Sequence, residues 1–141
     1  MTDTSQELSA NACDILSRVR VGISDTLKGE ILPTQTIALT VPGGKVGFRN
    51  GTTAEVRMSG RYWPILGEKT YVLFLTLSPD GDGYWLRGSM QGVYRIDPDT
   101  GVIRPADMRG RRPLVRRFRG MKSGAFLREI RSIVAQQAGT Q

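Results

Sequence analysis

Two kinds of residue in this sequence have types and spacings suited to chemistry: a dense run of arginines and a pair of alternating aspartates. The run, residues 109–122, holds six arginines and one lysine but no acid. The chain has twenty basic residues, so the other thirteen balance its thirteen acids, and the run accounts for the net charge of +7. Because guanidinium groups suit phosphate well, such a run can grip a polyanion. The candidate anion-binding residues are Arg109, Arg111, Arg112, Arg116, Arg117, Arg119 and Lys122.

The same run also has a structural interpretation. Leu114, Val115 and Phe118 look like apolar anchors that lay the segment on the rest of the domain. Its arginines would then pair with scattered acids or stay solvated. The sequence leaves both interpretations open.

Asp80 and Asp82 alternate with glycines, as the acids of a calcium loop do. In such a loop the bidentate glutamate would stand where this chain has Gln91, and no flanking helices are expected, so a hairpin turn is favoured. The Gly-rich stretch 42–47 lacks the GK[ST] ending of a phosphate-binding loop and predicts a twisted turn. Spacing does not place Glu55 and Glu68, which leaves a glycosidase-like carboxylate pair as an alternative.

The residues that most enzymes use are scarce. The chain has no histidine, and Cys13 is its only cysteine. Catalytic triads, cysteine–histidine catalysis, the common zinc sites and intramolecular disulfides are therefore excluded. We expect no catalytic residues, no metal site and no cofactor, and hence a binding or accessory module that is not an enzyme.

Three aromatic residues offer a different kind of site. Tyr84, Trp85 and Tyr94 fall on expected neighbouring strands, where they could form a platform on which nucleic-acid bases stack. If they lie together on one exposed sheet face, they favour a nucleic-acid partner. If they are buried, they favour a protein partner.

The elements that position these residues are organised around an apolar hairpin. Residues 67–77 form an aromatic and β-branched run, 78–83 a turn rich in Gly, Asp and Pro, and 84–86 a second apolar run. The continuous apolarity of 71–75 predicts a strand covered on both faces. Further strands are expected at 18–23, 36–41, 45–51, 53–58, 93–96 and 102–103, and apolar residues at Phe126, Leu127, Ile130, Ile133 and Val134 predict an amphipathic helix.

The predicted fold is mainly β: a small antiparallel OB-like barrel of about five to seven strands with one C-terminal amphipathic helix at about 123–137. Residues 1–14 are expected to be a loose lead-in and 15–141 a single domain. The chain has no run of about 18 apolar residues, and its N-terminus is polar where a signal peptide is basic and then apolar.

Several motifs carry a resemblance to a known group. These are LKG at 27–29, VPGGKV at 41–46, GEKTYVLFL at 67–75, QGVY at 91–94 and FLREI at 126–130. Together they resemble a group of small uncharacterised bacterial β-barrel proteins over roughly residues 15–133. More loosely, they resemble netrin and tissue-inhibitor-type modules, whose fold is an OB-like barrel with helices attached. Neither resemblance implies an activity.

Members of the bacterial group commonly have a leader and another strand before the equivalent of Arg18. Either the start of this chain is truncated, or Ser5–Ile15 supplies that strand. The expected location is cytoplasmic by default and exported if the start is truncated. The expected function is a non-catalytic β-barrel module that contacts another protein. The alternative is binding of nucleic acid or another polyanion through 109–122. The oligomeric state is open.

Overall fold

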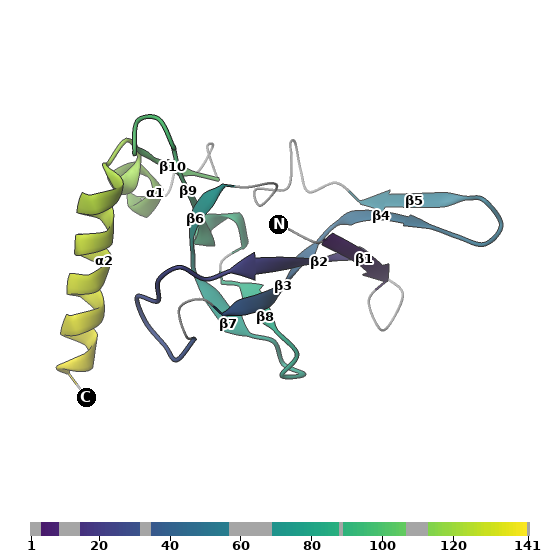
Figure 1. Ribbon diagram of the computed structural model, residues 1–141, viewed down its shortest axis with the longest axis horizontal. Helices are drawn as coiled ribbons and strands as arrows, with labels where there is room; N and C mark the ends of the chain where they lie inside the picture. Colours follow the sequence, from purple (N-terminus) through teal and green to yellow (C-terminus); the bar gives the residue numbers. More distant parts are fainter. Residues whose placement is uncertain are drawn as a thin grey trace.

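The computed structural model describes residues 4–8, 15–31, 35–56, 69–87, 89–106 and 113–140. Within these ranges the protein is mainly β, with short strands in three sheets and one long helix near the C-terminal end. The expected mainly β class with a C-terminal helix is confirmed. The helix α2 and the two-stranded ribbon β4–β5 lie at opposite ends of the long axis (Figure 1).

The largest sheet has the strand order β1-β2-β3-β8-β7. Its neighbouring strands are antiparallel except for β3 and β8, which run parallel. The expected alternation in β2 and β3 is confirmed, because Val19, Leu39 and Val41 are all buried. The bounds of the five strands are β1 Thr4–Leu8, β2 Ile15–Gly22, β3 Thr36–Pro42, β7 Leu75–Leu77 and β8 Tyr84–Leu86.

Part of the expected loose lead-in, residues 1–14, belongs to this sheet. Strand β1 pairs antiparallel with β2, from Thr4 opposite Val19 to Leu8 opposite Ile15. The sequence TSQEL lacks apolar alternation, so a pattern-based prediction misses a strand that is held by backbone hydrogen bonds at the sheet edge.

The central apolar run divides between two sheets. Strand β6 (Thr70–Leu73) pairs with β9 (Val93–Ile96), whereas β7 pairs with β8 in the predicted hairpin. Between them, the N–H of Phe74 donates to the carbonyl of Gly92 (2.9 Å), and the carbonyl of Phe74 accepts from the N–H of Arg87 (2.8 Å). One stretch of chain therefore links the five-stranded sheet to the three-stranded sheet β10-β9-β6, in which β10 is Ile103–Pro105.

Two apolar cores lie on opposite faces of the three-stranded sheet. The first contains Val93 together with residues of the five-stranded sheet, and Tyr71 and Leu73 of β6 pack against it. The second contains Tyr94, and Val72 of β6 packs against it. The prediction that residues 71–75 form a strand covered on both faces is confirmed for β6, which alternates between two cores.

The second core is closed by helices. A 3-10 turn, η1 (Ser89–Gly92), precedes β9, and α1 (Pro113–Phe118) and α2 (Ser123–Ala138) follow β10. Phe126 and Ile130 are the buried residues of α2, and Ile133 in the same predicted stripe stays 37% exposed. The predicted helix at about 123–137 is confirmed. Its N-cap is Lys122, whose side chain makes no capping hydrogen bond.

The third sheet is the two-stranded ribbon of β4 (Gly44–Gly47) and β5 (Thr53–Val56). Gly43 and Gly44, with φ of 101° and 133°, turn the chain out of β3 and into β4. Such φ values are unfavourable for residues with a Cβ atom, so the two glycines permit this turn. The ribbon projects from the body of the molecule (Figure 1).

The predicted antiparallel OB-like barrel is not closed among the described residues. They contain ten strands rather than five to seven, in three open sheets. The edges of the largest sheet are β1 and β7, and these do not pair with each other. The part of the central apolar run that forms β6 pairs with β9 in the separate three-stranded sheet. The parallel β3–β8 pair is a second departure from the prediction.

Candidate functional site

The described part of the basic segment begins with α1. Arg116, Arg117 and Arg119 are exposed, while Phe118 is buried in the second core. Phe118 therefore anchors the segment, as its sequence predicted. Arg109, Arg111 and Arg112 lie outside the described residues, as do the side chains of Leu114 and Val115.

Arg117 and Lys122 of this segment make contacts within the fold. Arg117 forms an ion pair with Glu129 of α2, and its guanidinium also lies 5.6 Å from the centre of the Phe118 ring. The ammonium of Lys122 donates to the carbonyl of Thr100 (2.7 Å). These contacts fasten α1 and the following turn to α2 and to the loop before β10. They agree with the structural interpretation for Arg117 and Lys122.

The three predicted platform aromatics do not share a surface. Tyr94 is only 5% exposed, and its ring centre lies 5.1 Å from that of Phe126. Burial raises the pKa of the Tyr94 phenol. Tyr84 is half-buried against the first core, whereas its neighbour Trp85 points to the other side of the sheet and is 41% exposed. Trp85 is thus the exposed member of the three.

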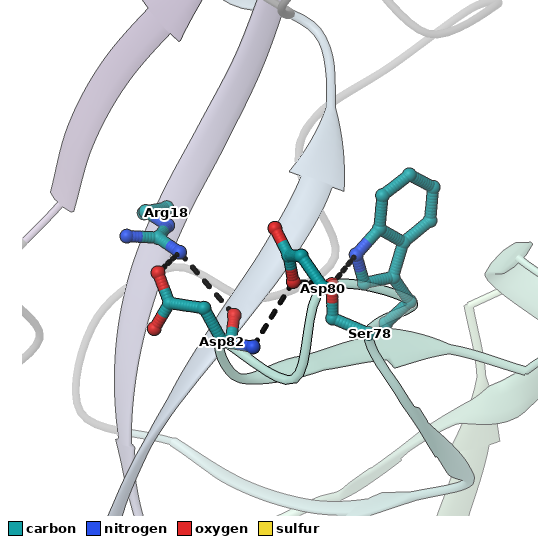
Figure 2. Close-up of polar contacts among 5 residues, drawn as sticks. Arg18, Ser78, Asp80 and Asp82 are labelled. Carbon is teal, nitrogen blue, oxygen red and sulfur yellow. Dashed lines mark hydrogen bonds and ion pairs between the residues drawn. The ribbon is translucent and has the colours of Figure 1, made fainter.

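A polar cluster fixes Trp85 (Figure 2). The indole N–H donates to the hydroxyl of Ser78 (3.2 Å), and that hydroxyl donates to the carboxylate of Asp80. The same carboxylate accepts from the N–H of Asp82 (3.0 Å). Arg18 of β2 reaches across the sheet, forms an ion pair with Asp82 and donates to its carbonyl (3.2 Å).

This cluster explains why Asp80 and Asp82 alternate in the sequence. The hydrogen bond from Ser78, with those from the backbone of the turn, lowers the pKa of the Asp80 carboxyl. The Asp80 carboxylate therefore holds the β7–β8 turn, which agrees with the predicted hairpin turn. The Asp82 carboxylate ties this turn to β2. Within the described ranges, no group of three or more His, Cys, Asp or Glu is arranged to hold a metal ion.

Other predicted candidates are dispersed. Glu55 is exposed on β5, whereas Glu68 and Cys13 lie outside the described residues. The carboxylate of Asp97 accepts from the backbone N–H groups of Thr100 (3.0 Å) and Asp99 (3.0 Å) in the turn after β9. These bonds, led by the one from Thr100, lower the pKa of Asp97 to about 2.

The sequence analysis did not select the tip of the β4–β5 ribbon, yet it carries an exposed aromatic side chain. Phe48 is 44% exposed, and its N–H donates to the carbonyl of Thr52 (2.8 Å). The N–H of Gly51 donates back to the carbonyl of Phe48 (3.0 Å). The side-chain oxygen of Asn50 accepts from both the N–H (3.0 Å) and the hydroxyl (2.6 Å) of Thr52. The available signal in the sequence was the Asn50-Gly51 turn two residues after Phe48.

The sequence matches none of the protein-family models with which it was compared, and comparisons with curated proteins and with solved structures give no match either. The resemblance to the bacterial group therefore stays a prediction. In the described part of the chain, no helix combines the length and apolarity needed to cross a bilayer.

Proposed function

We propose that this protein is a non-catalytic binding module that contacts another protein molecule through the β4–β5 ribbon. The observation that carries the proposal is Phe48, a 44% exposed aromatic at a tip braced by the two Asn50 bonds. Buried aromatic anchors contribute most to protein interfaces, and an anchor held in place before binding loses less conformational entropy.

The positions of the other aromatics support a protein partner over a base-stacking surface. Tyr94 is buried beneath α2 and Tyr84 faces the first core, so of the three predicted platform aromatics Trp85 alone is exposed for stacking. A platform for successive bases needs several exposed rings along one groove.

Two features support the absence of catalysis. The chain has no histidine, which removes the usual general base near neutral pH. The carboxylates of Asp80 and Asp97 accept hydrogen bonds that organise their own turns, which favours their ionised forms and suits structural roles better than proton transfer.

The strand order supports an OB-like architecture in which the sheet does not close into a barrel. An OB fold is a five-stranded, partly open Greek-key barrel. In the five-stranded sheet, the meander β1-β2-β3 is followed by β8, parallel to β3, and then by β7. Our proposal therefore includes an OB-like architecture for this sheet, in which the edge strands β1 and β7 do not pair with each other.

The proposal can be tested with a photo-crosslinking amino acid at position 48 of the full chain, expressed in the organism that makes it. The control carries the same group at position 133, where Ile133 is similarly exposed on α2. We expect a discrete adduct from position 48 alone. Against the purified adduct partner, Phe48→Asp should weaken binding about tenfold or more, which is about 1.4 kcal/mol, and Ile133→Asp less than about twofold. Equal adducts at both positions, or equal weakening, would contradict the proposal.

A second candidate function is binding of a polyanion by the basic segment, favoured by the exposure of Arg116 and Arg119 beside the anchored Phe118. For a single-stranded oligonucleotide, the logarithm of affinity should fall with the logarithm of salt concentration by about 0.7 per neutralised phosphate.

Replacing Arg111, Arg112, Arg116 and Arg117 by Ala should flatten that slope. Arg131→Ala, which removes a cation paired with Asp25, is the matched control and should leave the slope unchanged. Equal slopes for the wild type and the fourfold variant, or no binding at low salt, would eliminate this function.

A further inference from the structure

Two arginines occupy directly opposite positions in the three-stranded sheet. Arg95 of β9 faces Arg104 of β10, and both lie on the face of the sheet that carries the first core. The neighbours of Arg95 along the strand, Tyr94 and Ile96, pack in the second core on the other face, so alternation fixes the side on which Arg95 lies. Like charges at directly opposite positions repel each other and destabilise a sheet. The fold alone therefore gives no reason for this pair.

One nitrogen of the pair lacks an acceptor. Arg95 is half-buried, and its Nε is buried with no hydrogen-bond partner among the described residues. Leaving a buried donor of a charged group without an acceptor costs free energy, and folded proteins normally provide an acceptor for such groups. The Nε of Arg95 has lost its contact with water without gaining a protein acceptor in the described part of the chain. An anion from outside the chain can supply one.

The acid beside this pair is engaged elsewhere. One carboxylate oxygen of Asp97 accepts from the N–H groups of Asp99 (3.0 Å) and Thr100 (3.0 Å). Its other oxygen accepts from the Nε of Arg104 (3.0 Å). The side chain of Arg104 is still 54% exposed, so a ligand in solution can reach it. Two arginines and one aspartate leave this cluster with a net charge of +1.

We infer that Arg95 and Arg104 bind a small ligand through a phosphate monoester group. Directly opposite positions hold the Cβ atoms about 4.5–5.5 Å apart, so two arginine side chains can reach the same anion. Guanidinium groups bind phosphate through paired hydrogen bonds, and a phosphate monoester has a charge of about −1.5 to −2 at pH 7 with three acceptor oxygens. Three oxygens allow one phosphate group to accept from both arginines at once, including the Nε of Arg95.

This site is separate from the two surfaces considered above. The ribbon β4–β5 belongs to a different sheet. The α1 helix packs its Phe118 in the second core, across the three-stranded sheet from Arg95 and Arg104. The inference therefore goes beyond the proposed function, and binding at this site requires neither Phe48 nor the exposed arginines of α1.

Titration of the full chain with inorganic phosphate, followed by two-dimensional nitrogen–proton NMR at constant ionic strength, tests the inference. We expect the Nε–H signal of Arg95 to shift with Kd on the order of 1 mM, and phenyl phosphate to compete for the same site. Sodium chloride at the same ionic strength should not shift this signal. Dimethyl phosphate, a diester with two terminal oxygens, should bind at least about fivefold more weakly.

Variants locate the site, with Kd followed on the backbone amides of β9 and β10. Arg95→Gln and Arg104→Gln should each raise Kd for phosphate about tenfold. Arg95→Lys should also raise Kd, because an ammonium keeps the charge but lacks the guanidinium fork. Arg20→Gln removes the same charge from an exposed position on β2 and should change Kd less than about twofold. Arg104 is exposed, so Arg104→Gln remains informative if the Arg95 variants fold poorly.

An Arg95 signal that does not move with phosphate overturns the inference. Equal weakening by Arg104→Gln and Arg20→Gln also overturns it, because phosphate would then respond only to overall charge. Equal affinity for dimethyl phosphate overturns the assignment to a monoester. Each of these outcomes leaves the crosslinking result at position 48 unaffected, so the proposed function is judged separately.

Discussion

Replacing Phe126 by Ala tests the central claim about the fold, that α2 is docked on the three-stranded sheet. Phe126 is 0% exposed. Its ring centre lies 5.0 Å from that of Phe118 and 5.1 Å from that of Tyr94, so one side chain joins α1, α2 and β9.

The expected loss follows from the burial. Replacing a fully buried Phe by Ala costs about 3–5 kcal/mol, from the lost transfer free energy and the cavity that remains. The two ring contacts place this residue toward the upper part of that range. A domain of ordinary stability has about 5–15 kcal/mol in total, so the variant should fold but be weakened. With a urea m-value of about 2 kcal/mol/M, the unfolding midpoint should fall by about 2 M.

Urea unfolding followed by far-ultraviolet circular dichroism measures this shift. Ile133→Ala, in the same helix but 37% exposed, is the control and should lower the free energy of unfolding by less than about 1 kcal/mol. If Phe126→Ala lowers the midpoint no more than Ile133→Ala does, α2 is not packed as described and the second core is refuted.

Two further substitutions test the turns. A Cβ at Gly92 would lie 2.3 Å from the carbonyl oxygen of Arg87, so Gly92→Ala must displace backbone atoms and should lower Tm by about 5 °C. Gly47→Ala is the control and should lower Tm less, because a Cβ there would have nothing within 4 Å. Equal losses of Tm would contradict the crowding at Gly92. The hydrogen bond from the N–H of Thr100 is the main reason that the pKa of Asp97 is lowered from its ordinary value of 3.8 to about 2. The contribution of Asp97 to stability is therefore complete above about pH 4 and is lost as pH falls toward 2. Thermal melts at pH 5 and pH 2.5 should therefore differ less for Asp97→Asn than for the wild type, and an unchanged difference would show that Asp97 does not stabilise its turn.

Local patterns predicted the elements whose side chains alternate. Ile37, Leu39 and Val41 mark β3 because one face of that strand is buried. Phe126 and Ile130 likewise predict α2, because they are spaced so that they lie on the one face of the helix that is buried. Strand β1 was missed because its residues show no apolar alternation, although its backbone pairs along the whole of its length.

Long-range partners could not be predicted in this way. The parallel β3–β8 pair joins Leu39 to Tyr84, and no local pattern in either strand specifies a partner so far along the chain. The same holds for Arg18 with Asp82, and for Arg117, whose partner Glu129 comes close only because the turn after α1 reverses the chain. Local sequence patterns do not reveal such contacts, so they cannot assign a role that depends on them.

The difference between β6 and the ribbon links the fold to the proposed function. Strand β6 packs Tyr71 and Leu73 on one core and Val72 on the other, so changes in either core reach the same three-stranded sheet. Among the side chains that the structure describes in the ribbon, Phe48 included, none belongs to either core. Substitutions at Phe48 should thus leave the free energy of unfolding of the monomer almost unchanged, since exposed positions away from a core usually shift it by less than about 0.5 kcal/mol. An aromatic residue that adds so little to stability, yet is held in place at the ribbon tip, suits the partner-contacting role that we propose for it.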